Sequence, residues 1–276
     1  MITSLGNPTV KYIRSLHMKK YRESERRFIV EGLHLLEESI ASGWMPVIVA
    51  YEPETAERSD RLKRALAAAQ ETAKLLAVDR KVMKGIAQTA TPQGVIAVVP
   101  MHKSQALKPG GLVLVLEEIQ DPGNLGTIMR AAEAAGTSGV IISESSADPF
   151  DGKCLRATAG ALFRLPFLAD QDWTEIGHLL RGRRIFLAEA HHETAHYRVD
   201  WTQPSAVILS NEAHGAGPSA RALAQSPVSI PMRGKTESLN VAMAATVIAF
   251  EAARQLDMQA ETKRVGRPKP SGREGR

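Results

Sequence analysis

The stretch Leu112-Val-Leu-Val-Leu-Glu-Glu-Ile-Gln-Asp-Pro-Gly-Asn-Leu-Gly-Thr-Ile-Met-Arg-Ala-Ala-Glu-Ala-Ala-Gly136 predicts the fold of the larger part of this chain. It opens with Leu and Val residues from Leu112 to Leu116, a run typical of a strand buried on both faces of a parallel sheet. Asp121-Pro-Gly then breaks the strand. Asn124 stands at an N-cap position, before apolar residues at helical spacing. Because Val140-Ile-Ile142 follows as another strand, the pattern predicts an open parallel α/β sheet.

Two polar residues of this stretch are expected near a binding site. Ligands of open parallel sheets bind at the carboxyl ends of the strands, where Asn124 and Arg130 should lie. The alternative is that Asn124 only caps the helix and that Arg130 is a solvated helix residue. On this stretch alone the alternative is favoured, because caps are common and sites are few.

Two later stretches change this interpretation. Ala206-Val-Ile-Leu-Ser-Asn-Glu-Ala-His-Gly215 reads as a strand followed by a polar loop that contains Glu212. The segment from Val228 to Ala245 reads as a short strand, a loop and a long helix that begins with Ser238-Leu-Asn240. The three stretches resemble, in order and spacing, the three motifs of the SpoU/TrmH class of SPOUT RNA methyltransferases. Those motifs are Asn…Arg, Gly-x-Glu and Ile-Pro-Met…Ser-Leu-Asn, and the match runs from Leu112 to about Arg254.

The resemblance implies an architecture. It implies a SPOUT-type α/β fold with a mainly parallel sheet, a carboxy-terminal trefoil knot, and a homodimer formed through the knotted domain and the last helix, expected over Leu239–Gln255. It also implies a small amino-terminal α/β domain that resembles a ribosomal RNA-binding protein, on the segments Arg27–Gly32 and Thr91–Ala97. The expected divisions are an RNA substrate-binding domain (1–100), a linker (101–110), a methyltransferase domain (111–257) and a basic disordered tail (258–276).

The resemblance also assigns catalytic residues. Transfer from S-adenosylmethionine to a ribose 2′-hydroxyl depends on positioning this poor nucleophile and on stabilising the developing alkoxide. Arg130 is expected to face that oxygen. The family proposal makes it the base, whereas a guanidinium that stays protonated would instead stabilise the alkoxide and grip the adjacent phosphate. Asn124 would bind the ribose or hold Arg130, and Glu212 would fix its loop or pair with Arg130. Ser238 and Asn240 open the last helix, whose amides suit a polar ligand, although an ordinary N-cap role for Ser238 stays open.

The cofactor in this family is held largely by backbone groups around the second and third motifs. By position these groups belong to Leu209, Ser210, Ile230, Met232 and Leu239. The chain departs from the family pattern at Ser210 and Ala213, where the family usually has Gly. If either Gly requires a positive φ, the loop here must differ in shape.

The composition limits the other possibilities. With 276 residues, 43% hydrophobic and 24% charged, the chain has the profile of a soluble globular protein. A net charge of +5 favours polyanionic partners only weakly. The single Cys154 excludes an internal disulfide and suits a reducing compartment. Neither a signal segment nor an apolar run of about 20 residues is visible, so we expect a cytoplasmic protein without a membrane partner.

One motif points elsewhere. His192-Glu-Thr-Ala-His196 matches the His-Glu-x-x-His pattern of zinc proteases, which requires both His side chains on one face of a helix. The five residues follow a predicted strand that ends near Ala188, and Pro204 leaves little room for a helix, so no metal is expected. Three hypotheses remain: a ribose 2′-O-methyltransferase, an RNA-binding homologue without catalysis, and a zinc hydrolase. For the substrate, 23S-type ribosomal RNA is preferred over transfer RNA because of the separate amino-terminal domain.

Overall fold

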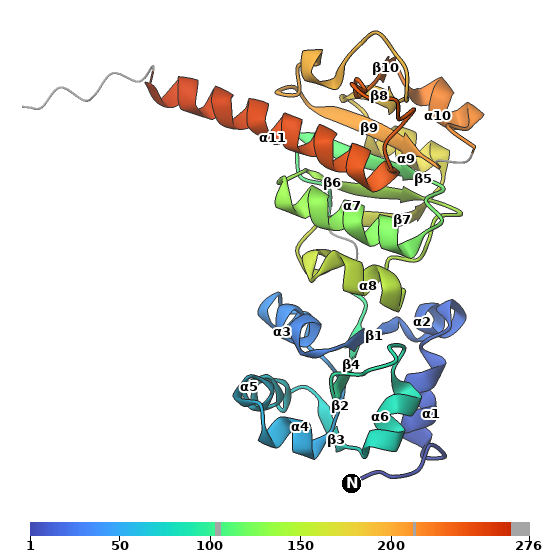
Figure 1. Cartoon of the computed structure of the whole chain (residues 1–276), viewed down its shortest axis with the longest axis vertical. Coiled ribbons are helices and arrows are strands. Elements are labelled where there is room, and N and C mark those ends of the chain that lie inside the picture. The colour runs from blue at the N-terminus through green and yellow to red at the C-terminus, as the bar shows by residue number, and fades with distance from the viewer. Residues whose placement is uncertain (103–105, 212–213, 266–276) are drawn as a thin grey trace, which may run out of the picture.

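The structure, a computed structural model, describes residues 1–102, 106–211 and 214–265 and contains two sheets (Figure 1). The four-stranded sheet has the order β1-β4-β2-β3, and the six-stranded sheet has the order β10-β8-β9-β5-β6-β7. The elements of the first part are α1 (Pro8–Ser15), α2 (Lys19–Glu25), β1 (Arg27–Glu31), α3 (Leu33–Ala41), β2 (Ile48–Tyr51), α4 (Pro53–Glu57), α5 (Asp60–Ala69), β3 (Lys74–Ala77), α6 (Arg80–Ile86) and β4 (Val95–Pro100). Those of the second part are β5 (Leu112–Glu117), α7 (Pro122–Ala134), β6 (Gly139–Ser143), α8 (Gly152–Thr158), η1 (Ala161–Phe163), β7 (Phe167–Gln171), α9 (Trp173–Leu179), β8 (Arg184–Ala188), η2 (His196–Arg198), β9 (Ser205–Ser210), α10 (Pro218–Leu223), β10 (Ser226–Val228) and α11 (Val241–Val265).

The six-stranded sheet confirms the predicted α/β class. Its neighbouring strands pair in parallel, and β5 lies between β9 and β6. All six residues of β5 are buried, as expected for a central strand covered by helices on both faces. The parallel order brings the carboxyl ends of β5, β8 and β9 to one edge, where the site is expected. The trefoil knot stays a prediction.

The four-stranded sheet has helices on both faces. Residues of α1 and α6 pack on one face and residues of α3 and α5 on the other. Two details differ from the sequence prediction. The Ala-rich sequence from Asp60 to Leu75 predicts one helix, but α5 ends at Ala69, because Lys74–Ala77 pairs with β2 as a parallel edge strand. The basic sequence from Val10 to Tyr21 predicts a single helix, whereas the structure has two helices, α1 and α2, separated after Ser15.

The ends of two helices, α7 and α11, also differ from the sequence prediction. Asn124 is not the N-cap of α7: Asp121 is, and its carboxylate accepts the amide of Asn124 at 2.9 Å, with Pro122 in the first helical position. The last helix begins at Val241 and continues to Val265, so the predicted disorder from residue 258 is wrong up to Val265. The rest of the expected tail, 266–276, lies outside the described residues. None of the helices described is long and apolar enough to cross a membrane.

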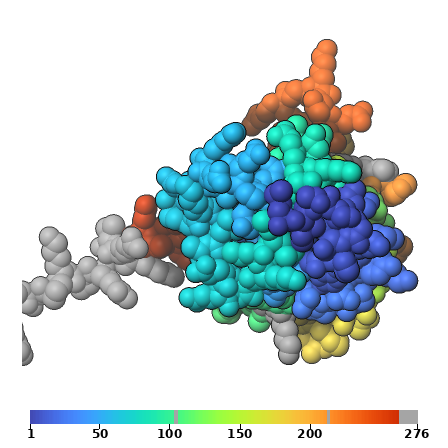
Figure 2. All heavy atoms as spheres, turned by 90° about the horizontal axis from the view of Figure 1, so that it is seen from below, coloured from blue at the N-terminus to red at the C-terminus, as the bar shows by residue number. Residues whose placement is uncertain are grey.

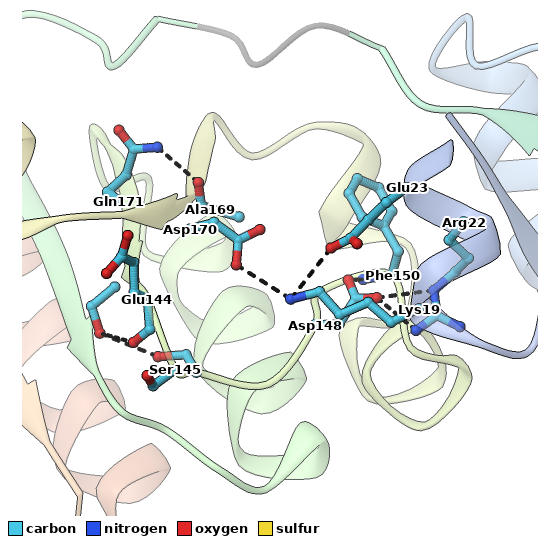
Figure 3. A network of polar contacts seen from close by, with 12 residues as sticks. Lys19, Arg22, Glu23, Glu144, Ser145, Asp148, Phe150, Ala169, Asp170 and Gln171 are labelled. Carbon is cyan, nitrogen blue, oxygen red and sulfur yellow. Dashed lines mark hydrogen bonds and ion pairs between the residues drawn. The ribbon is translucent and has the colours of Figure 1, made fainter. Parts of the chain in front are cut away.

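A buried junction joins the two sheets. Arg22 is 4% exposed, and its Nε and Nη2 donate to one carboxylate oxygen of Asp148 at 2.9 and 2.6 Å. Figure 3 shows this contact between Arg22 and Asp148. The Arg22 Nη1 donates to the carbonyls of Leu16 and His17. Beside this pair Phe28 of β1 contacts Phe150, with ring centroids 4.8 Å apart. One apolar cluster therefore runs through both parts of the chain.

Candidate active site

A cleft of about 430 Å³ opens around the carboxyl ends of β8 and β9 and the amino-terminal end of α11. This volume lies in the range of small-molecule sites. All five residues predicted to bind the cofactor line it, and so does Ser238: Leu209, Ser210, Ile230, Met232, Leu239 and Ser238. Val241, Ala244 and Ile248 of α11 add apolar surface. The structure thus gathers residues of the second and third motifs around one space.

Ser210 sits where the family usually has glycine, and its side chain has a partner. Its Oγ donates a 2.6 Å hydrogen bond to Oε2 of Glu117, the last residue of β5. Ser210 is not among the described residues with a positive φ, so the serine costs no backbone strain at this position. The predicted departure in loop shape is therefore not required at Ser210, and Ala213 lies outside the described residues.

Glu117 also holds the second-motif loop from its far end. The carboxyl group is 4% exposed, and its two oxygens accept the amide of Gly217 at 3.2 and 3.3 Å. A Cβ added at Gly217 would lie 2.9 Å from Oε1, so a larger residue there would displace the Glu117 carboxyl group. A buried carboxyl group needs such donors. Glu117 thus ties together the two ends of a loop that borders the cleft.

The rim of the cleft carries both signs of charge. Arg221 Nη1 contacts Glu189 Oε1 at 2.7 Å, and both residues line the cleft. Glu189 directly follows β8, and Arg221 belongs to α10. An ion pair at the edge of the cleft suits a ligand with an ammonium and a carboxylate group, because each ion could exchange its partner for the ligand.

The first and third motifs meet through two amides. Asn240 Nδ2 donates to Asn124 Oδ1 at 3.1 Å, so the amino-terminal ends of α7 and α11 lie together. Asn240 Oδ1 accepts the amides of Ala242 at 3.0 Å and Met243 at 3.4 Å. Asn240, not Ser238, is therefore the residue whose side chain caps α11.

The structure places the predicted catalytic residues Arg130 and Asn124 outside the cleft. Arg130 lies on α7 with an exposed side chain, and within the described residues it forms no hydrogen bond or ion pair. It does not line the cleft, and neither does Asn124. Glu212 lies outside the described residues. The structure thus joins Asn124 to Asn240 and leaves the Arg130 guanidinium available for a ligand.

The zinc-protease interpretation is wrong. Residues 192–195 form no helix: Ala195 makes a parallel bridge with Ser229, and only a short 3-10 turn, η2, follows. The His192 carbonyl accepts Ser229 Oγ at 2.7 Å. Burial lowers the pKa of His196. In the part of the chain that the structure describes, no three His, Cys, Asp or Glu side chains lie together in a group that could hold a metal ion.

Sequence reasoning missed Glu117, Glu189 and Arg221. A signal existed for the first two, since each is the first acidic residue after a run of strand residues, at the edge where ligands bind. Arg221 belongs to α10, a helix that the sequence prediction omitted.

Comparisons with known proteins agree with this architecture. A profile of the SpoU rRNA Methylase family matches residues 111–250, and a profile of the MRM3-like substrate binding domain matches residues 7–97. Among curated proteins, the 23S rRNA (guanosine(2553)-2'-O)-methyltransferase RlmP of Bacillus subtilis is 31% identical, over 90% of this chain and 97% of its own.

Solved structures are similar over nearly the whole chain. The AdoMet-bound rRNA methyltransferase from Sinorhizobium meliloti superposes with a TM-score of 0.81 and 31% identity, covering 92% of this chain and 97% of that one. The SpoU methyltransferase AviRb from Streptomyces viridochromogenes, in complex with AdoMet, has a TM-score of 0.83 and 27% identity, covering 90% and 98%.

Proposed function

Because the chain belongs to the SpoU rRNA Methylase family, we propose that it moves a methyl group from S-adenosylmethionine to a ribose 2′-hydroxyl of 23S-type ribosomal RNA. The observation that carries the proposal is the cleft, which gathers the five positions assigned to the cofactor beside the Asn124–Asn240 contact. Relatives whose names specify 2′-O-methylation of 23S rRNA cover nearly the whole chain. Such a reaction belongs where ribosomes are assembled, which fits the expected cytoplasmic location.

The residues of the cleft fit the proposed cofactor. Leu209, Ile230 and Leu239 supply apolar surface for an adenine ring, and Glu189 with Arg221 supplies the charges that an amino-acid group needs. Ser210 and Met232 complete the lining. When bound, S-adenosylmethionine supplies a methyl group on a sulfonium that any suitably aimed oxygen nucleophile accepts.

For the acceptor ribose, catalysis would depend on positioning of the 2′-hydroxyl and on electrostatic stabilisation. Arg130 would stabilise the developing 2′-alkoxide and hold the neighbouring phosphate, since a guanidinium keeps its charge. Asn124, oriented by Asn240, would bind the ribose. Ser238 lines the cleft near the start of α11 and would contact the cofactor, and Glu212 would fix the second-motif loop.

The amino-terminal part, residues 1–100, would bind the RNA, and 101–110 would link it to the methyltransferase domain. A profile of a substrate binding domain on residues 7–97 supports this assignment. Ribosomal RNA is preferred because the relatives with that substrate in their names match both parts of the chain. Transfer RNA is the second candidate.

We further propose a homodimer through α11. Met243, Val247, Phe250 and Met258 are exposed and lie on one side of this 25-residue helix. In Figure 1 the helix extends well beyond the six-stranded sheet. These exposed apolar side chains form a row that the charged Arg254 interrupts between Phe250 and Met258. Such a row favours a protein partner, and a second copy would bury it against its own.

The test is transfer of labelled methyl from S-adenosylmethionine to total RNA from cells that lack this protein. Wild type should label a ribosomal RNA band, and nucleoside digestion should locate the label on a 2′-oxygen. Arg130→Ala should lose the transfer, whereas Arg64→Ala, an exposed arginine of α5, should retain it. Label in transfer RNA would select the second substrate. Without label or cofactor binding, a non-catalytic RNA-binding homologue would replace the proposal.

A further inference from the structure

The two helices on the outer face of the four-stranded sheet carry only positive charge. Neither α1 nor α6 contains an Asp or Glu. Their five cations are all exposed: Lys11, Arg14, Arg80, Lys81 and Lys84, here called the basic face. In the described part of the chain, the side chains of these five residues form no hydrogen bond or ion pair with the protein. Their charges are therefore available to an external partner.

The basic face is a single surface. Val10 and Ile13 of α1 and Val82, Met83 and Ile86 of α6 are buried in one apolar cluster, which turns the charged sides of both helices outward. Figure 2 shows the dark blue amino-terminal segment beside the teal segment that follows β3. His17 Nε2 lies 2.8 Å from the carbonyl of Ile86, which joins the carboxyl ends of the two helices.

The opposite side of the same sheet differs in charge. The helices α3, α4 and α5 carry Glu37, Glu38, Glu54, Glu57 and Asp60 against three cations. Two of these cations are paired, Arg61 with Glu37 and Lys63 with Asp60. The sheet is thus positive on one side only, which is the electrostatic pattern of a nucleic-acid footprint.

A line of contacts connects the basic face to the first motif. Gln88, just after α6, accepts a 3.5 Å hydrogen bond from Arg156 of α8. On the same helix Lys153 Nζ contacts Asp121 at 2.6 Å, and Asp121 caps α7 three residues before Asn124. Arg156 and Lys153 are exposed. In Figure 1, α1 and α6 lie on the same side of the molecule as the amino-terminal ends of α7 and α11.

We infer that the basic face docks the phosphate backbone of the RNA whose nucleotide reaches Asn124 and Arg130; this inference rests on the proposed function. Exposed Lys and Arg side chains bind phosphates without reading sequence, so the face supplies affinity and orientation. The exposed Arg156 of α8, which has no carboxylate partner in the described residues, continues this path toward the first motif. Two carboxyl groups beside α6 form no ion pair with the cations of the basic face: Glu31 accepts the amide of Gln88 at 2.9 Å, and Asp79 accepts that of Val82 at 2.7 Å.

The test compares two double variants of the full chain with equal change in charge. Lys81→Gln with Lys84→Gln removes two cations of the basic face, and Lys63→Gln with Arg64→Gln removes two exposed cations of α5. Binding of protein-free large-subunit ribosomal RNA is measured by filter retention between about 50 and 200 mM salt, the range over which phosphate contacts lose most affinity. The first variant should bind about tenfold or more weakly near 100 mM salt, and its slope of log affinity against log salt should fall by roughly 1 to 2.

Further measurements separate docking from other effects. The first variant should raise the KM for RNA and leave the kcat and the affinity for S-adenosylmethionine unchanged. Lys81→Arg with Lys84→Arg should bind like wild type, since the charge is kept. Equal RNA affinity and equal slope for the two glutamine variants would overturn the inference. If wild type transfers no methyl group to RNA, the proposed function fails, while filter retention still decides whether the basic face binds RNA.

Discussion

The side-chain amide of Asn240 donates a 3.1 Å hydrogen bond to the side-chain carbonyl of Asn124, which joins the first turns of α11 and α7. The orientation of Asn240 follows from its second role, because its Oδ1 must face the amides of Ala242 and Met243. Only Nδ2 is then available to Asn124. Because this contact uses the Asn124 Oδ1, the donor that Asn124 could offer to a ligand is its Nδ2.

Asn240→Asp separates the two roles of this residue. Aspartate remains a good helix cap but has no donor for Asn124. We expect an unchanged melting temperature, unchanged affinity for S-adenosylmethionine and a fall in single-turnover rate of about tenfold or more, as misplaced catalytic groups produce. Asn240→Ala is the comparison, since it also loses the cap and should cost about 1 kcal/mol of stability. Wild-type turnover by Asn240→Asp would remove the Asn124 contact from the mechanism.

Ser210→Ala tests the tie between Glu117 and the second-motif loop. The substitution leaves the buried carboxyl group with the Gly217 amide as its remaining partner in the described residues. We expect a loss of about 1 to 3 kcal/mol in unfolding free energy, the usual cost of an unmet buried polar group. Titration calorimetry should show weaker binding of S-adenosylmethionine. Ser219→Ala, at an exposed position of α10, is the control and should match wild type in both measurements.

Phe250→Arg tests the proposed dimer. The Phe250 side chain is 48% exposed in the single chain and lies in the apolar row of α11. A charge there would be buried without a partner in a symmetric interface, which costs far more than burial of the ring gains. Light scattering after size exclusion should give the mass of one chain for this variant and of two for wild type. Met18→Arg, at a similarly exposed residue outside α11, should stay dimeric; a wild-type monomer would contradict the proposal.

Stability should fall in mild acid through His17. Burial lowers the pKa of this imidazole, and nearby Arg22 and Arg14 lower it further, while the hydrogen bond to Ile86 and the charge of Glu31 act in the opposite direction. Its Nδ1 is buried without a partner in the described residues. The unfolded chain therefore binds the proton more readily than the folded one. Stability should be full above the ordinary value of about 6.5 and should be lost as the pH falls from there toward the folded pKa.

Melting temperatures between about pH 7.5 and 5 check this expectation, a range that brackets the ordinary pKa of histidine. His17→Gln keeps a donor for the Ile86 carbonyl and cannot titrate, so its melting temperature should fall less over this range. Burial also lowers the pKa of His196, so the variant should flatten the curve only in part. Parallel curves for wild type and His17→Gln would exclude His17 as a source of the acid sensitivity.

The sequence predicted the central elements well, because a buried central strand has to be apolar throughout. The β5 run and the helical spacing of α7 belong to this class. The strands β3 and β7 were missed since each lies at the edge of its sheet and is only partly buried. An edge strand has one neighbour and needs no continuous apolar run.

For the candidate site, the sequence indicated residues but not the contacts between them. Motif order placed Asn124, Ser210 and Asn240, whereas the Ser210–Glu117 hydrogen bond joins residues 93 positions apart and depends on β9 pairing with β5. Local hydrophobic patterns in the sequence do not predict which strands become neighbours in a sheet. The cap of α7 was misplaced for a simpler reason: Asp121 before Pro122 is the stronger helix start, and Asn124 was then free for another role.

The buried Arg22–Asp148 pair has a consequence for substrate choice. Loss of one partner of such a pair is costly, so the amino-terminal part should not swing relative to the methyltransferase part. The distance between the basic face and Asn124 is then fixed, so it determines how far the methylated nucleotide lies from the docked part of the RNA. We expect the enzyme to select a nucleotide by its distance from a docked helix of folded RNA, and to tolerate changes in the bases around it.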